Sequence, residues 1–263
     1  MRRTKGMKKV TLVLVSTFML VLLLGMTTLA SEAALKKLKL GTTKEDVKTD
    51  RAAFKDYKIT VRNRSVISFS GAAYLPTGTY ESVRVELLNS KRKKINAVTT
   101  TVNVSSSTNT SGLYSVNKGT YYLRVRNSNP FVFAYATARV NENSGTRASN
   151  AKNLQRKKAR VGIIGAGEKK NAADYYKITL KKARKVNFQV SSRSGSTGVA
   201  ISISGSRIRT ATGWIVTNSV DHQKESMRIV GRGNKLPAGT YYVKVSRARA
   251  AKGRDALYSI YWK

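Results

Sequence analysis

The side chains most capable of chemistry in this sequence are its cations. The 263 residues include 50 Lys and Arg against 13 Asp and Glu, which gives a formal net charge of +37. Cysteine is absent and His222 is the single histidine, which excludes disulfides, thiolate or histidine-rich metal centres and a cysteine nucleophile. The composition therefore points away from cofactor chemistry and towards binding of an anionic partner.

Many of the cations form short runs that we expect on loops and turns, where they can reach a flexible polymer. Tyrosines beside cations on two predicted strands add rings on which sugars or bases can stack. The predicted polyanion-binding residues are Lys91, Arg92, Lys93, Lys94, Tyr122, Arg124, Arg126, Arg156, Lys157, Lys158, Lys181, Lys182, Arg184, Lys185, Tyr242, Lys244, Arg247 and Arg249. The alternative is that the charge serves only solubility or an unusual habitat.

Catalysis has little support in the sequence. His222 follows Asp221, but no serine lies in a nucleophile-elbow pattern, and residues 221–224 are typical of a polar loop. The acids are scattered among the cations, which suits ion-pair partners and turn residues better than a glycosidase pair. The glycines of 162–167 lack the helix that a phosphate-binding loop requires. We therefore expect a protein without enzymatic activity and without a cofactor.

The N-terminal segment has the pattern of a secretion signal. Five cations and no acid lie in residues 1–9, and residues 10–30 form an uncharged, mainly apolar run that ends in small residues. An uncleaved anchor is the alternative, because this run is long enough to span a bilayer. We predict a cleaved signal at 1–33 and a secreted or cell-surface protein, with membrane association only if the segment is retained.

Two motifs occur twice along the chain. The Asp-Tyr-Lys-Ile-Thr-Val segment of 56–61 recurs with one added tyrosine in 174–180, and the Gly-Thr-Tyr-Tyr-Leu-Arg-Val segment of 119–125 recurs in 239–245. The interval between the two motifs is nearly the same in both copies. This pattern predicts a duplicated module, and its period is too long for a solenoid repeat.

Period-2 alternation dominates both copies, and helical periodicity is rare. Short strand-like runs are separated by turn formers such as the Pro-Thr-Gly of 76–78 and the Pro-Ala-Gly of 237–239. Many short strands with regular turns predict an all-β fold. We expect two tandem antiparallel β-sandwich domains of jelly-roll type, at 34–140 and 141–263.

Alternation also predicts which side chains of the Gly-Thr-Tyr-Tyr strands are buried. The inward residues should be Tyr121, Leu123, Val125, Tyr241, Val243 and Val245. The outward residues should be Tyr122, Arg124, Arg126, Tyr242 and Lys244.

The second copy resembles a known bacterial family. The segments 150–154, 161–164, 174–180, 236–245 and 258–262 are similar in order and spacing to the pre-peptidase C-terminal domain family. The resemblance covers roughly 148–263, and more weakly 53–140. It implies a secreted, non-catalytic β-sandwich that serves as an accessory, solubilising or substrate-binding module beside an extracellular enzyme.

Some members of that family bind matrix proteins and hold calcium through acids near the entry strand. In this sequence residues 165–174 offer only Glu168 and Asp174, beside Lys169 and Lys170. Calcium takes six to eight oxygen ligands, often from several carboxylates. We therefore expect no metal here.

Together these patterns predict an exported binding protein whose basic modules associate with anionic polymers of the cell envelope or extracellular matrix, such as wall phosphate polymers or acidic polysaccharides. Delocalised Lys and Arg attraction would make binding weaken steeply with salt. Nucleic acid would bind only non-specifically. The alternative is a module that docks a specific extracellular protein or matrix component through a compact apolar patch, with the charge incidental.

Overall fold

The structure is a computed structural model, and it describes residues 44–48, 52–96, 99–104, 109–110, 112–192, 198–205, 208–216, 224–229, 235–248 and 254–263. The predicted signal at 1–33, His222 and Arg249 lie outside the described residues. No described segment forms a helix of the length and hydropathy needed to cross a membrane.

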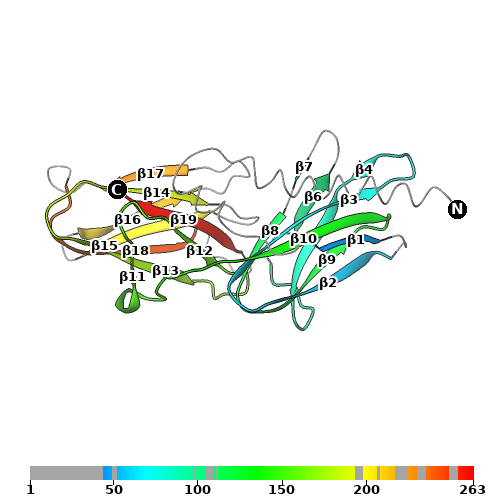
Figure 1. Cartoon of the computed structure of the whole chain (residues 1–263), viewed down its shortest axis with the longest axis horizontal. Helices are drawn as coiled ribbons and strands as arrows, with labels where there is room; N and C mark the ends of the chain where they lie inside the picture. Colours follow the sequence, from blue (N-terminus) through cyan, green and yellow to red (C-terminus); the bar gives the residue numbers. More distant parts are fainter. Residues whose placement is uncertain are drawn as a thin grey trace.

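The strands from β1 to β10 form two antiparallel sheets, which together we call the N-terminal sandwich (Figure 1). One sheet has the order β1 (Lys44–Lys48), β10 (Phe131–Arg139), β3 (Ser65–Tyr74) and β4 (Tyr80–Glu81), with β8 (Gly112–Val116) also paired to β3. The other has the order β2 (Phe54–Val61), β9 (Gly119–Arg126), β5 (Val83–Asn89), β6 (Thr100–Val104) and β7 (Asn109–Thr110).

The strands from β11 to β19 form two further sheets, the C-terminal sandwich, which a 3-10 helix, η1 (Ala148–Asn150), precedes. One sheet has the order β11 (Lys152–Asn153), β13 (Ala173–Leu180), β18 (Gly239–Arg247), β15 (Val199–Gly205) and β16 (Ile208–Val216). The other has the order β12 (Arg160–Ile164), β19 (Ala256–Trp262), β14 (Val186–Ser192) and β17 (Lys224–Ile229). Only the β11–β13 pairing is parallel among the described strands.

The strand order of the two sandwiches is the same. The N-terminal order β2, β9, β5, β6 corresponds to β13, β18, β15, β16, and β1, β10, β3 corresponds to β12, β19, β14. The all-β architecture predicted from the alternation is therefore confirmed. Figure 1 shows the two sandwiches end to end along the long axis of the molecule.

Each sandwich encloses its own hydrophobic core between its two sheets. In the C-terminal sandwich, Tyr241 and Val243 of β18 pack with Phe188 of β14 and Ile260 of β19. The N-terminal core is built in the same way from β9, β3 and β10. Every inward residue predicted for the recurring strands is fully buried except Tyr121, which is half-buried and packs against the N-terminal core.

The two aspartates of the recurring entry strand face opposite sides of their sheets. Val61 pairs with Gly119 and Leu180 with Gly239, so the register makes Asp56 equivalent to Tyr175. Asp174 is one residue further back, because the second copy contains an extra tyrosine. Since side chains alternate along a strand, this shift turns Asp174 into the interior, where it is 4% exposed.

Gly162 of β12 provides a test of the packing. It pairs with Tyr258, and a Cβ atom at this position would lie 2.3 Å from the fully buried phenol oxygen. We predict that Gly162→Ala lowers the free energy of unfolding by about 1–3 kcal/mol, as measured by urea denaturation, because the rigid ring cannot move aside. Gly167→Ala is the matched control, since the nearest atom to its Cβ, Ile95 Cδ1, is 4.0 Å away. Equal stability of the two variants would contradict this packing.

Candidate functional site

On the outer face of the N-terminal sandwich, predicted binding cations are paired with carboxylates. Arg124 donates from Nε and Nη2 to the two oxygens of Asp56 at 2.8 and 2.9 Å. Arg126 Nε donates to Glu86 at 2.8 Å, and Lys94 Nζ lies 3.2 Å from the other oxygen of Glu86. Partial burial opposes ionisation of Glu86, but the hydrogen bonds from Arg126 and Lys94 hold its pKa below the ordinary value. These cations are therefore compensated within the protein.

The turn after β5 carries the other N-terminal candidates. Asn89 Oδ1 accepts hydrogen bonds from the backbone N–H groups of Lys91 and Lys93, both at 3.0 Å, and Arg92 adopts a left-handed conformation with φ of 57°. The Arg92 guanidinium lies 5.0 Å from the ring centroid of Tyr122. Lys91 and Lys93 are exposed, and neither forms an ion pair with any residue that the structure describes.

The C-terminal sandwich brings two separate cation runs to one groove. Arg156 follows β11, and Lys181, Lys182 and Arg184 follow β13. Between them lies a groove of about 880 Å³. It is lined by Asn153, Leu154, Gln155, Arg156, Lys177, Thr179, Leu180, Lys181, Lys182, Arg184 and Trp262. We call these residues the basic groove.

The C-terminal strand holds this groove together. Trp262 Nε1 donates to the Leu154 carbonyl at 2.6 Å, and the Trp262 carbonyl accepts from the backbone N–H of Lys157 at 2.7 Å. Leu154, Leu180 and Trp262 are each at most 5% exposed, so they form a packed apolar floor. The cations above it are thus displayed from a rigid base, which lowers the entropy lost on binding a ligand.

The charge of the basic groove is one-sided. Its lining includes five cations and no carboxylate, and within the described part of the chain none of these cations forms an ion pair. Lys157, Lys158 and Lys185 are exposed at neighbouring positions of the chain. A concave surface with cations of one sign over a low-dielectric floor concentrates positive potential and attracts anions.

One predicted binding residue does not belong to the surface. Arg247 is 3% exposed, and its guanidinium donates to the carbonyls of Arg254, Glu168 and Lys169. The prediction that Arg247 stands free on a loop is therefore wrong. Residues 241, 243, 245 and 247 share the inward face, and β18 continues far enough to include the arginine.

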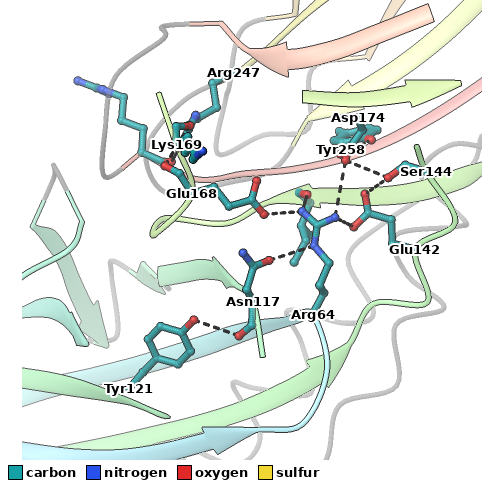
Figure 2. A network of polar contacts seen from close by, with 12 residues as sticks. Arg64, Asn117, Tyr121, Glu142, Ser144, Glu168, Lys169, Asp174, Arg247 and Tyr258 are labelled. Atoms are coloured by element: carbon teal, nitrogen blue, oxygen red, sulfur yellow. Dashed lines mark hydrogen bonds and ion pairs between the residues drawn. The ribbon is translucent and has the colours of Figure 1, made fainter. Parts of the chain in front are cut away.

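Carboxylates of the chain after β10 gather where the two sandwiches meet. Arg64, from the turn between β2 and β3, lies 2.6 Å from Glu142, 2.7 Å from Glu168 and 3.6 Å from Asp174 (Figure 2). Burial opposes the charge on Arg64, yet the three carboxylates raise its pKa above the ordinary value. Nearby, the fully buried Asp255 accepts a hydrogen bond from the Ser115 backbone N–H at 2.7 Å.

Two of these carboxyl groups contact the same hydroxyl. Ser144 Oγ lies 2.8 Å from Glu142 Oε1 and 2.9 Å from Asp174 Oδ1, and a hydroxyl has one hydrogen to donate. A proton on one of the two carboxyl groups would complete the second contact. Burial, together with the charge of Asp174, raises the pKa of Glu142 to about 9, and burial also raises the pKa of Asp174. Tyr258 supports the arrangement by donating to Asp174 Oδ2 at 2.7 Å.

The described acids of the C-terminal sandwich lie at the junction and do not line the basic groove. Residues 141–263 contain 26 Lys and Arg against 6 Asp and Glu. Every one of those acids whose side chain the structure describes lies at the junction, namely Glu142, Glu168, Asp174 and Asp255. None of them is left to neutralise the groove.

Sequence reasoning missed Lys177, Thr179 and Trp262 as groove residues and Arg64 as the cation of the junction. Lys177 and Thr179 occupy outward positions of the recurring entry strand, so alternation could have identified them. The placement of Arg64 depends on packing between the sandwiches, for which the sequence has no local signal.

The fold and surface define a class, an all-β protein of two antiparallel sandwiches with a basic groove on the second. No family model and no curated protein matches the chain. Among solved structures it is similar to the pre-peptidase C-terminal domain of a collagenase from Bacillus anthracis (14% identity, 46% of this chain and 100% of that chain, TM-score 0.30). It is also similar to the tandem CBM22-1-CBM22-2 domain of Paenibacillus barcinonensis Xyn10C (10% identity, 87% and 93%, TM-score 0.26) and to the CUB1-EGF-CUB2 domain of human MASP-1/3 (10% identity, 85% and 100%, TM-score 0.25). Likenesses of this size assign the chain to no family.

The raised pKa of Glu142 predicts a pH dependence of stability. Because the pKa of Glu142 is about 9 in the folded protein and near 4.5 when exposed, the folded state binds more protons between these values, and stability falls as pH rises through this window. Glu142→Gln keeps a neutral hydrogen-bonding side chain at this position. We expect the stability of the variant relative to wild type to rise from pH 5 to pH 9 in urea denaturation. A difference that is independent of pH would contradict the raised pKa of Glu142.

Proposed function

We propose that this chain is an exported, non-catalytic binding protein that associates with anionic polymers of the cell envelope or its surroundings through the basic groove. The observation that carries the proposal is the set of five groove cations, Arg156, Lys177, Lys181, Lys182 and Arg184, none of which is paired with a described carboxylate. A polyanion that enters the groove supplies the missing negative charge and releases its own counterions.

The groove chemistry supports binding rather than turnover. Its lining contains no His, Cys, Asp or Glu, so the Thr179 hydroxyl has no general base among these residues. Asn153 and Gln155 add amide groups that can hydrogen-bond to a neutral part of the same polymer. Such a lining suits a repeating ligand with both anionic and hydroxyl groups, as found in wall phosphate polymers and acidic polysaccharides.

The alternative, docking of a specific protein through an apolar patch, has less support. Among the described residues, the large hydrophobic side chains classed as exposed are Phe54 and Tyr80, at 41% and 39%. The Arg124 guanidinium lies 4.1 Å from the Phe54 ring centroid, so part of that ring is already covered. Two separated rings do not make the contiguous apolar patch that typifies a protein-docking surface.

Removal of groove charge tests the proposal. We expect wild-type protein to bind immobilised polyphosphate more weakly as the salt concentration rises. A plot of log affinity against log salt concentration should have a slope of roughly −3 to −4 if each of the five cations contacts one phosphate. Lys181→Gln combined with Lys182→Gln should weaken binding roughly three- to tenfold at physiological salt and reduce the slope by about 1 to 2. Elution in a salt gradient and titration at several salt concentrations measure both effects.

Lys91→Gln combined with Lys93→Gln is the matched control. It also removes two exposed lysines from a turn, but on the N-terminal sandwich. We expect this control to bind almost as wild type. Equal weakening by the two double variants would show that binding is spread over the whole surface, and retention that does not respond to salt would refute the polyanion mechanism.

A further inference from the structure

The equivalent sheets of the two sandwiches differ in the charge of their outer faces. In the N-terminal sandwich, the register places Asp56, Arg124 and Glu86 side by side across β2, β9 and β5. Residues directly opposite on neighbouring strands interact across the face. The arginine therefore lies between two carboxylates, and this row is compensated by the protein itself.

The equivalent row of the C-terminal sandwich contains neither acid. The register places Tyr175, Lys244 and Ser202 side by side across β13, β18 and β15. Lys244 has the position of the N-terminal arginine, but a tyrosine and a serine replace the two carboxylates. Within the described residues, Lys244 forms no ion pair. Because neutral residues occupy the positions of both acids, this row has a net positive charge.

The adjacent row of the C-terminal sandwich differs from its N-terminal counterpart in a contact between a cation and a tyrosine ring. It consists of Lys177, Tyr242 and Ser204, side by side on the same three strands. The ring equivalent to Tyr242 in the N-terminal sandwich is Tyr122, which Arg92 covers at 5.0 Å. No described cation lies over the Tyr242 ring in this way, so the ring can accept a ligand.

We infer that this surface is a second binding face, which takes the sugar rings of an acidic polysaccharide. We call it the sheet face and define it by six residues, Tyr175, Lys177, Ser202, Ser204, Tyr242 and Lys244. The inference rests on the proposed function, because the same polymer occupies both sites. Lys177 lines the basic groove and also belongs to the sheet face, so the two surfaces are continuous.

The residue types of the sheet face fit a charged sugar polymer. A tyrosine ring offers an apolar surface to the C–H groups of a sugar ring, and its hydroxyl remains available for hydrogen bonds. Serine hydroxyls donate to and accept from sugar hydroxyls, and lysine pairs with a carboxylate or sulfate group. A polymer without rings would use only the lysines. The sheet face thus adds recognition of sugar rings to the charge recognition of the groove.

Two probes separate these contributions: immobilised alginate, which has charges and sugar rings, and immobilised polyphosphate, which has charges alone. We expect Tyr242→Thr to weaken alginate binding roughly threefold to tenfold and to leave polyphosphate binding unchanged. Threonine keeps the strand preference, and an unchanged thermal midpoint shows that the fold is intact. Tyr175→Thr is the second variant if Tyr242→Thr does not fold.

Tyr122→Thr removes the same side chain from the equivalent position of the N-terminal sandwich, and it should change binding to neither probe. The Lys181→Gln and Lys182→Gln double variant should weaken binding to both. Unchanged alginate binding by Tyr242→Thr, or equal weakening on both probes, overturns the sheet face. Failure of wild type to bind either probe overturns the proposed function itself. Tighter Tyr242-dependent binding to single-stranded DNA than to alginate would assign the face to nucleic acid instead.

Discussion

The placement of the described acids in the C-terminal sandwich depends on the contact between Arg64 and three carboxylates of the chain that follows β10. Desolvated carboxyl groups at a junction need a cation or a proton, since an unpaired buried charge is costly. Arg64 supplies the cation to Glu142, Glu168 and Asp174, and burial with the charge of Asp174 raises the pKa of Glu142, which favours its neutral form. The same residues place the two sandwiches relative to one another, beside an apolar contact that includes Val66, Val140, Ile163 and Leu257.

The chain has few acids, so the carboxylates that lie at the junction are not available to pair with cations on the outer surfaces. The equivalent face of the N-terminal sandwich has Asp56 and Glu86, and there the cations bind carboxylates and cover aromatic rings. The C-terminal sandwich has the same strand order but directs its described acids to the junction. Among the described residues, no carboxylate pairs with the cations of its groove or of its sheet face. The fold is common to both halves, and the difference between them is the partner available to each cation.

The sequence predicted the all-β class and the buried faces because period-2 alternation is a local property, which tertiary packing preserved in β9 and β18. It did not predict the pairing of Arg124 with Asp56, because that contact requires the register between strands far apart in the chain. Arg247 lies on β18 and not on a loop, because the strand extends two residues beyond the recurring motif, which ends at Val245. The groove joins two runs of cations, near residues 156 and 181. The pairing of β11 with β13 brings these runs together, and the sequence alone does not show that pairing.

The shared strand order explains how the two sandwiches can differ in surface charge without loss of stability. Ion pairs such as those of Arg124 with Asp56 and of Arg126 with Glu86 contribute little net energy when they are partly exposed, because desolvation and side-chain ordering offset the attraction. Neutral residues in place of the two acids therefore alter the surface potential far more than they alter folding. The cores beneath, built from inward residues of the same strands, stay intact in both sandwiches. One sandwich thus pairs the cations of this face with Asp56 and Glu86, and in the other no described carboxylate pairs with Lys244.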